Sequence, residues 1–539
     1  MAEKSQPKTV ILQYSETTTP PLAGGARGGG SAMGLYDFTF YHLICRNAVS
    51  FKGRQALLEA EDGRGLTFDQ YKVLVDQLAA GLKKSGVTKG DRIGVLAKNS
   101  LEYFALFGAA SALGAIMVPV NWRLSPDEIS FILKDSRPGI VIADQEYQET
   151  IKGLKGNLPG VEKYYSLGPG DNDFLPFDSL LAPQGDFAPL EILTDDGFVI
   201  IYTAAVAGRP RGALLSHGNV LCSSMHFGYY MKVTPKDVLL NFLPFFHVGG
   251  LFMATTCFLA GGSNINMPRF DAARAVELIE QKGVSFMMVF SPILASLVEA
   301  HEKTGKKINS LTAVTGIDTK ETIEKYEKVT GGTFYVLYGQ TETSSLATMG
   351  PYRDRPGSAG KMLLFTEVQL VDDTDRPVGT GQVGEIAVRG PMVFKGYWNL
   401  PEDTAQTFRE GWHHTGDLGR FDEEGFLWYA GRKAEKELIK PGGENVYPAE
   451  VEKVILQHPA IERTAVIGVP DPKWKEGIKA VCQLRKGHSL DPQALIDFVG
   501  ERIARYKKPQ VVQLVDALPL LPDGSVDRAK VKSLYGGEQ

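Results

Sequence analysis

The chain has 539 residues and a net charge of −5, from 58 basic and 63 acidic side chains. Single hydrophobic cores stop growing near roughly 250–300 residues, so at least two domains are expected. Hydrophobic residues make up 43% of the chain and charged residues 22%, which excludes a largely disordered, collagen-like or coiled-coil protein. The charge balance also argues against nucleic acid as the main partner, because such proteins usually carry a strongly basic surface.

The N-terminus and the cysteines bear on location. Residues 1–33 are polar and aperiodic and include a GGG run, so we expect a flexible tail there. No basic start precedes an apolar run, so no secretory signal is expected. Four cysteines without a close pair argue against a disulfide framework and a zinc site, and favour the reducing cytoplasm.

One stretch, Tyr103–Val120, carries no charge over 18 residues, which is the lower limit for a membrane-spanning helix. It contains Gly108, Gly114 and Pro119 and lacks flanking aromatic and basic anchors. We therefore expect a helix that stops at Gly114 and then a strand, with no transmembrane segment.

Strands and helices alternate from about residue 90 onward. Arg92–Ala97 is predicted as a buried strand, followed by a helix to Leu113 and a strand over Ala115–Val120. Ser125 is placed to cap the next helix in a capping box, and Ile140–Ala143 is the next strand. This alternation predicts parallel strands with right-handed crossovers, and hence a large α/β domain built from βαβ units.

The last hundred residues have a different pattern. Short helices and strands alternate within a segment of domain size, and we expect a small α+β domain there. The expected division is a tail at 1–33, a large domain at 34–432 and a small C-terminal domain at 433–539. The predicted elements of the small domain are helices at 448–457 and 492–504 and strands at 464–469, 480–484 and 511–515.

The segment Phe198–Gly212 reads FVIIYTAAVAGRPRG. A strand feeds a loop of small residues that contains Gly208 and Arg211, before a helix expected near Ser216. Small residues allow backbone N–H groups to approach an anion, and an arginine adds positive charge. The alternative is an ordinary strand–turn–helix connection.

The segment FYVLYGQTET at 334–343 ends a predicted strand in a glycine turn. Thr341 and Thr343 can donate to phosphate oxygens, and Glu342 can hold Mg²⁺, which prefers oxygen ligands. The alternative is a polar turn that caps a helix.

Two later segments add candidates. In GWHHTGDL at 411–418, Asp417 follows a glycine and could accept hydrogen bonds from the two hydroxyls of a ribose. The stretch 430–450 combines basic residues, a Pro-Gly-Gly turn and a helix start at Pro448. The alternatives are a turn aspartate and a charged linker between domains.

Taken together, YGQTET, TGDLG and GGENVYPAEVE resemble the adenylate-forming superfamily, which includes acyl-CoA synthetases, adenylation domains and firefly luciferase. The resemblance runs from about Gly34 to Val531, and GGENVYPAEVE is similar to the acyl-CoA ligase branch. It implies that a carboxylic acid reacts with ATP to give an acyl-adenylate and pyrophosphate, and that CoA then displaces AMP. It also implies Mg²⁺ and a small domain that rotates between the two steps, with its hinge in Lys433–Glu437.

The resemblance also implies roles for single residues. Thr341 contacts the adenylate phosphate, Glu342 binds Mg²⁺, and Asp417 with Arg432 holds the ribose hydroxyls. His247 lies beside the acyl carboxylate, with a buried structural histidine as the alternative. The implied catalytic residues are Thr341, Glu342, Arg211 and His247; the nucleotide-binding residues are Thr203, Gly208, Gly212, Tyr338, Gly339, Gln340, Thr341, Asp417 and Arg432; the CoA-binding residues are Lys440, Gly442, Gly443 and Glu444.

Two departures from the family pattern concern the first half-reaction. Ala204–Ala207 replaces the Ser-Gly-Thr-Thr of the usual phosphate loop, and Arg211 replaces a lysine. Ser525 stands where the family has a C-terminal catalytic lysine. A third and smaller change lies at Thr315–Asp318, where the family often has a Gly-Gly-Ala-like adenine contact.

The sequence predicts an acyl-CoA ligase that uses ATP, Mg²⁺ and CoA. The acid is expected to be hydrophobic (fatty, alicyclic or aromatic), because Leu243–Phe252 and Ser285–Phe290 carry no charge. Two alternatives stay open: a homologue that thioesterifies acyl-adenylates but makes them slowly, and a protein that binds acyl-CoA or nucleotide without turnover. A homodimer is also left open.

Overall fold

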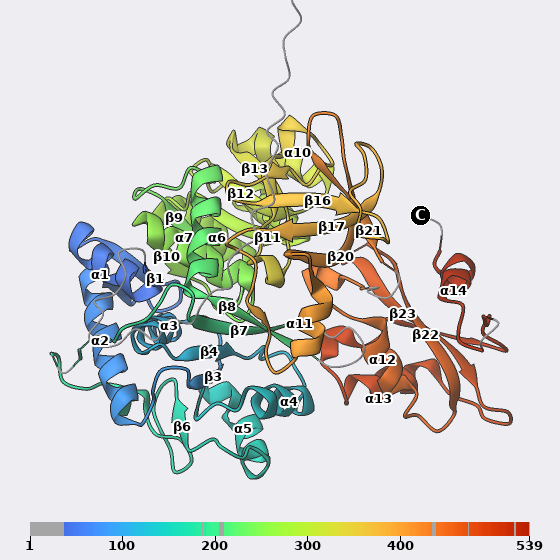
Figure 1. The fold of residues 1–539 in the computed structure, drawn as a ribbon, viewed down its shortest axis with the longest axis horizontal. Coiled ribbons are helices and arrows are strands. Elements are labelled where there is room, and N and C mark those ends of the chain that lie inside the picture. The colour runs from blue at the N-terminus through green and yellow to red at the C-terminus, as the bar shows by residue number, and fades with distance from the viewer. Residues whose placement is uncertain are drawn as a thin grey trace, which may run out of the picture.

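The computed structural model describes residues 37–185, 187–188, 190–203, 210–433, 438–472, 474–521 and 524–537. Within these ranges the strands form four sheets, three in the large N-terminal part and one in the C-terminal part (Figure 1). The expected fold class is therefore confirmed: a large multi-sheet α/β domain is followed by a smaller α+β domain.

The seven-stranded sheet has the order β18-β8-β7-β4-β3-β5-β6. Strands β3, β4, β5, β6 and β7 are parallel neighbours, whereas β8 and β18 run antiparallel at one edge. The predicted βαβ alternation is thus confirmed. The elements are β3 (Arg92–Leu96), α3 (Leu101–Leu113), β4 (Ile116–Pro119), α4 (Pro126–Ser136), β5 (Ile140–Ala143), α5 (Gln148–Leu154), β6 (Lys163–Ser166), β7 (Gly197–Thr203), β8 (Arg211–Ser216) and β18 (Gly396–Tyr397).

The uncharged stretch is a helix followed by a strand, as predicted. Ser100 caps α3, and Gly114 ends it at φ 68°, a left-handed conformation that glycine adopts without strain. Nearly every residue of α3 is buried, because the helix lies inside the main core. In the described part of the chain no helix has both the length and the apolarity needed to span a membrane.

The nine-stranded sheet has the order β15-β14-β13-β12-β11-β9-β10-β1-β2. Its central strands are parallel, and helices cover it on both faces (Figure 1). Its strands are β1 (Gln55–Glu59), β2 (Gly65–Thr67), β9 (Val238–Asn241), β10 (Ser263–Asn266), β11 (Phe286–Phe290), β12 (Ala313–Ile317), β13 (Thr333–Tyr338), β14 (Thr348–Pro351) and β15 (Lys361–Met362), with helices α1 (Phe40–Ser50), α2 (Phe68–Lys84), α6 (His217–Tyr230), α7 (Val248–Ala260), α8 (Ala272–Lys282), α9 (Ile293–Thr304) and α10 (Lys320–Thr330).

The third sheet is antiparallel and closes the N-terminal part. Strand β20 pairs with β17, β19 and β21. The elements are β16 (Glu367–Val371), β17 (Gly384–Arg389), α11 (Pro401–Thr407), β19 (Phe408–Arg409), β20 (Trp412–Phe421) and β21 (Leu427–Arg432).

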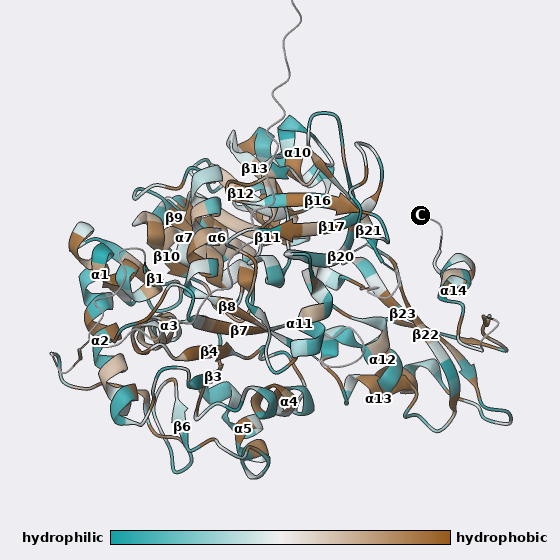
Figure 2. Cartoon of the chain, viewed as in Figure 1, coloured by the Kyte–Doolittle hydropathy of each residue, from teal (hydrophilic) through white to brown (hydrophobic). Residues whose placement is uncertain are grey.

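The C-terminal part has a three-stranded sheet and a hydrophobic core of its own, in which Val451, Ile478 and Leu495 are fully buried. Brown segments of β22 and β23 mark this second core in Figure 2, apart from the brown strands β4, β7 and β8 of the large part. The elements are α12 (Pro448–Ile455), β22 (Ile461–Asp471), β23 (Lys475–Leu484), α13 (Pro492–Gly500), β24 (Val511–Val515) and α14 (Arg528–Tyr535).

The surroundings of Arg211 and Gly212 differ from the predicted loop. Both residues belong to strand β8, where Arg211 pairs with Thr203 and Gly212 with Tyr202 of β7. The expected helix then begins at His217, capped by Ser216. Arg211 is therefore held in the strand pair β7–β8. Gly212 has no side chain, which lets β8 lie close to β7: an added Cβ would lie 2.6 Å from Ile200 and 3.0 Å from Tyr202.

Candidate active site

A cavity lies where the three N-terminal sheets meet the C-terminal part. Strands β7, β8, β11, β12 and β13 and the segment after β21 all contribute to its wall. Nine of the predicted site residues line it. They are Thr203, Arg211, His247, Gly339, Gln340, Thr341, Glu342, Arg432 and Lys440.

Glu342 lies in the 3-10 turn Thr341–Thr343 that follows β13, and it is buried. Its Oε1 accepts a hydrogen bond of 2.8 Å from the hydroxyl of Tyr397. Burial, and then the charge of Glu342, raises the pKa of Tyr397, so this hydroxyl stays protonated and can only donate to the carboxylate. The guanidinium of Arg211 lies 4.3 Å from the centre of the Tyr397 ring. A carboxylate, a phenol and a guanidinium thus converge on one wall of the cavity.

Asp417 on β20 lies opposite Arg432 on β21. Its Oδ2 accepts hydrogen bonds from the Tyr338 hydroxyl at 2.8 Å and from Gln340 Nε2 at 2.6 Å. Its Oδ1 lies 2.8 Å from Arg432 Nε, but the N–H is not directed at it, and neither atom has a hydrogen-bond partner in the described part of the chain. The two atoms form an ion pair but no hydrogen bond, so both can still bond a ligand with vicinal hydroxyls, because buried polar groups are normally hydrogen-bonded.

His247 is the N-cap residue of α7. Its Nδ1 accepts a hydrogen bond of 3.1 Å from the backbone N–H of Gly249, and burial lowers its pKa. The neutral ring therefore carries its proton on Nε2. His247 lines the main cavity and also a second cavity, which opens beside Thr341, Asn445 and Tyr506.

The segment after β21 faces the site. Lys440, Asn445 and Tyr447 line the main cavity, and Glu444 lines the second one, where it forms an ion pair with Arg123 of the N-terminal part. Desolvation by the surrounding protein lowers the pKa of Lys440, and the charge of Arg432 lowers it further.

Other predicted residues stand further back. Gly442 has φ 59° and packs so closely on Trp474 that an added Cβ would lie 2.7 Å from the indole. Gly442 and Gly443 both belong to the short 3-10 turn Pro441–Gly443, and neither lines the cavity. Tyr338 lies behind the cavity wall and holds Asp417. Ser525 is exposed and is not part of the cavity lining.

Two predictions fall outside the described residues. Gly208 and the altered phosphate loop lie in 204–209, and the expected hinge lies mainly in 434–437. Lys433, which precedes that segment, is described and forms an ion pair with Glu385 at 3.0 Å.

Sequence reasoning missed several cavity residues. Asn445 and Tyr447 could have been found, because they lie inside the GGENVYP motif itself. Tyr397 and Lys507 carried no signal of their own, since each reaches the site from an element distant in the chain from the motifs.

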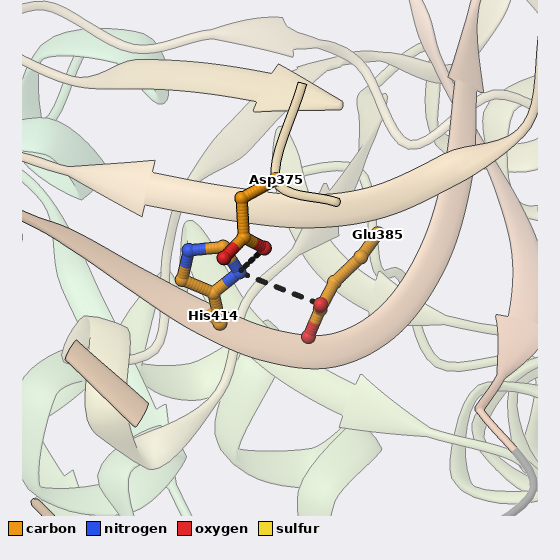
Figure 3. A group of neighbouring side chains, drawn as sticks. All are labelled: Asp375, Glu385 and His414. Carbon is orange, nitrogen blue, oxygen red and sulfur yellow. Dashed lines mark hydrogen bonds and ion pairs between the residues drawn. The ribbon is translucent and has the colours of Figure 1, made fainter. Parts of the chain in front are cut away.

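Asp375, Glu385 and His414 form a group with the composition of a metal site (Figure 3). However, Arg409 donates to both oxygens of Asp375, at 2.7 and 2.8 Å, and Lys433 Nζ lies 3.0 Å from Glu385. Cationic side chains thus already supply the positive charge that this group requires. We interpret it as a structural network that anchors the end of β21.

Comparisons with known proteins agree with this geometry. Residues 45–398 match the family described as AMP-binding enzyme, and residues 450–524 match the AMP-binding enzyme C-terminal domain. An indoleacetate–CoA ligase from Aromatoleum aromaticum is 33% identical over 499 residues, which cover 91% of this chain and 97% of that protein.

Solved structures give the same result. A chain from Rhodopseudomonas palustris described as a long-chain-fatty-acid CoA ligase is 46% identical, covers 74% of this chain and all of that one, and has a TM-score of 0.71. The o-succinylbenzoate CoA synthetase MenE of Bacillus subtilis, bound with a product analogue, is 28% identical with a TM-score of 0.82, over 92% and 99% of the two chains. ATP-bound MatB from R. palustris is 30% identical with a TM-score of 0.67, over 93% and 99%.

Both family matches and the related structures define the class: an enzyme that activates carboxylic acids with a nucleotide. The chain belongs to the AMP-binding enzyme family of the adenylate-forming superfamily. It is an AMP-forming acyl-CoA ligase whose substrates and cofactors are a carboxylic acid, ATP, Mg²⁺ and CoA.

Proposed function

We propose that the enzyme joins a hydrophobic acid to CoA and that the acid occupies the apolar wall of the main cavity. That wall is formed by Val248, Met288, Phe290, Ile317 and Leu337. No charged side chain stands among these five, so the wall favours an apolar acyl group and leaves the carboxylate to face the polar side. The indoleacetate ligase named above is consistent with an aromatic or alicyclic acid.

The opposite wall suits the nucleotide. We assign the ribose hydroxyls to Arg432, which lines the cavity, and to Oδ1 of its ion-pair partner Asp417, which is buried and is not part of the lining. We assign the phosphates to Thr203, Thr341 and the turn at Gly339 and Gln340. Arg211, held over Tyr397, supplies positive charge to the phosphates. Glu342 would hold Mg²⁺, whose charge offsets that of the phosphates when it is bound.

The C-terminal segment suits CoA. Lys440 and Glu444 lie at the two cavities, and Gly442 and Gly443 form the tight turn between them. Neutral His247 with its proton on Nε2 stands where the two cavities meet, so it can donate a hydrogen bond to an acyl oxygen while a thiol approaches along the second cavity. The role of each residue in CoA binding is inferred from this position.

A second candidate function has one observation in its favour. Ser525 carries no charge and is not part of the cavity lining. By the resemblance, the C-terminal domain therefore lacks the lysine that the family uses in adenylation. In this alternative, the enzyme converts acyl-adenylates to acyl-CoA readily but forms them slowly.

One experiment distinguishes the two candidates. ATP–pyrophosphate exchange over a panel of fatty, alicyclic and aromatic acids measures adenylation, and release of AMP from supplied acyl-adenylates with CoA measures thioesterification. A full ligase gives both activities with the same acids. Thioesterification without exchange supports the second candidate, and neither activity overturns both.

Location and assembly stay predictions. All four cysteines are free thiols, which suits a reducing compartment such as the cytoplasm. We place the domain boundary at Lys433, and a homodimer is still untested.

A further inference from the structure

Lys507 is an almost completely buried cation at the junction of the two parts of the molecule. Its side chain is 2% exposed, and its Nζ lies 2.6 Å from Glu128 Oε1 and 2.5 Å from Glu450 Oε2. Both carboxylates are therefore within ion-pair distance of the same ammonium. Burial of a lone cation costs free energy, so a lysine at this position is stable only with carboxylate partners such as these two.

The two carboxylates belong to different parts of the chain. Glu128 is on α4 of the N-terminal part, which lies next to the C-terminal part in Figure 1, whereas Glu450 is on α12 of the C-terminal part. The backbone N–H of Ala504 also donates to Glu128 Oε2, at 3.2 Å. A rotation of the C-terminal part would therefore keep Lys507 with Glu450 and remove it from Glu128.

The contact between Lys507 and Glu128 exists in an arrangement that places residues 440–447, which we call the CoA-facing segment, at the site. Lys507 lines the second cavity together with Glu444 and Asn445. In the same arrangement Ser525 lies away from the main cavity. The structure also superposes with a TM-score of 0.82 on MenE bound with a product analogue and 0.67 on ATP-bound MatB.

We propose that Glu128 is a positioning residue for the second half-reaction: its ion pair with Lys507 holds the C-terminal domain in the arrangement that forms the thioester. This inference rests on the proposed ligase function. Glu128 touches no reacting atom and acts only through the population of that arrangement. Removing its charge shifts the population toward arrangements in which the CoA-facing segment has left the site.

Glu128→Gln is a clean test. Glu128 is also the N3 residue of α4. In the capping box of this helix, its Oε2 accepts a hydrogen bond from the backbone N–H of the N-cap residue Ser125. Glutamine serves in a capping box as well as glutamate does, so the helix start is retained. The variant loses the charge and one acceptor oxygen, and with them the ion pair with Lys507. Glu450 stays in place to pair with Lys507, so the C-terminal domain is expected to fold.

The measurement compares the two half-reactions in the same variant. For Glu128→Gln we expect thioesterification of a supplied acyl-adenylate to slow about 10- to 100-fold at saturating CoA, with adenylation unchanged or faster. Glu128→Asp should recover part of the rate. Glu299→Gln, which removes an exposed carboxylate that pairs with Lys303 on α9, is the matched control and should behave as the wild type.

Domain arrangement gives a readout independent of activity. Spin labels on Glu149→Cys and Glu501→Cys, both exposed, report the distance between the two parts in a Cys45→Ala background. The Glu128→Gln variant should broaden or shift this distance distribution without ligands. If wild-type enzyme forms acyl-CoA but Glu128→Gln changes neither half-reaction nor the distance, the inference is wrong. If the wild type forms no acyl-CoA, the proposed function fails instead, and the distance measurement alone then decides the role of the ion pair.

Discussion

Asp417 and Arg432 face each other across the neighbouring strands β20 and β21, with Oδ1 and Nε 2.8 Å apart and neither atom in a hydrogen bond within the described residues. The next residue, Lys433, is held by Glu385 of β17. The proposed ribose contact is therefore adjacent in the chain to the segment that leads into the C-terminal domain. A nucleotide bound at this pair would sit next in the chain to the hinge that we propose in Lys433–Glu437.

Asp417→Asn tests the ribose assignment. The change removes the charge and replaces an acceptor with a donor, and a hydrogen bond to a charged group contributes about 1.5–3 kcal/mol. We expect the KM for ATP to rise about 10- to 100-fold in steady-state kinetics, with a smaller change in kcat. Tyr338→Phe removes only the hydroxyl that supports Asp417 and should raise the KM less. An unaltered KM for ATP in Asp417→Asn would place the ribose elsewhere.

Glu342→Gln tests the metal assignment. The swap is nearly isosteric and keeps an oxygen that can accept from Tyr397, so the fold should be intact. We expect adenylation to fall strongly, by about 100-fold or more, with the loss greatest at low Mg²⁺. Tyr397→Phe is the control, since it removes the same hydrogen bond but leaves the carboxylate. Wild-type rates at low Mg²⁺ would rule out a metal role for Glu342.

Ser525→Lys tests whether this position corresponds to the family's catalytic lysine. A cation brought near the phosphate in the adenylation arrangement could contribute about 2–4 kcal/mol, so pyrophosphate exchange should rise roughly 30- to 1,000-fold. Thioesterification should be unchanged, because Ser525 is not part of the lining of either cavity in the described arrangement. Slower adenylation would mean that another cation already fills the position. Equal changes in both half-reactions would mean that the residue acts on stability.

Glu385 predicts a dependence of stability on pH. Burial acts to raise the pKa of Glu385, but its contacts with His414 and Lys433 outweigh burial and lower the pKa to about 2. Because this value lies below the unfolded one, the stabilisation is complete above about pH 4.5 and is lost as the pH falls toward 2. The shift corresponds to about 3 kcal/mol at pH 7 and about half of that at pH 3.

Thermal unfolding of Glu385→Gln and the wild type measures this effect. The melting temperature of the variant should lie well below that of the wild type at pH 7, and the difference between the two melting temperatures should be smaller at pH 3. If the difference in melting temperature does not change with pH, the variant is destabilised by altered packing and not by the missing charge. Glu367→Gln, which removes the exposed carboxylate paired with Arg389, is the control and should show little effect at either pH.

Much of the fold follows from local signals in the sequence. The capping box at Ser125 and the stop at Gly114 both mark helix ends found in the structure, because these signals depend on neighbours within one turn. The helix predicted over 492–504 ends at Gly500 instead. Ends that lack such a signal are set by tertiary packing, which short-range patterns do not encode.

The site was predictable only in part, for a related reason. Residues such as Thr341 and Asp417 could be singled out because they lie in the motifs YGQTET and TGDLG, but the contact of Asp417 with Tyr338 and Gln340 joins the two motifs across the chain and is seen only in the structure. Strand β8 was missed, because it is defined by pairing with β7 and with β18, which lies far along the chain. The ion pair of Glu128 and Lys507 joins residues 379 positions apart and depends on how the domains are arranged.

The most direct test of the account is product analysis of a complete reaction. Purified protein is incubated with ATP, Mg²⁺, CoA and each acid of the fatty, alicyclic and aromatic panel, and AMP, ADP, pyrophosphate and acyl-CoA are quantified together. The account predicts AMP, pyrophosphate and acyl-CoA in equal amounts for at least one hydrophobic acid, with no ADP. Ligand-dependent stabilisation without AMP or acyl-CoA from any acid would contradict it, and would leave a protein that binds these ligands without turnover.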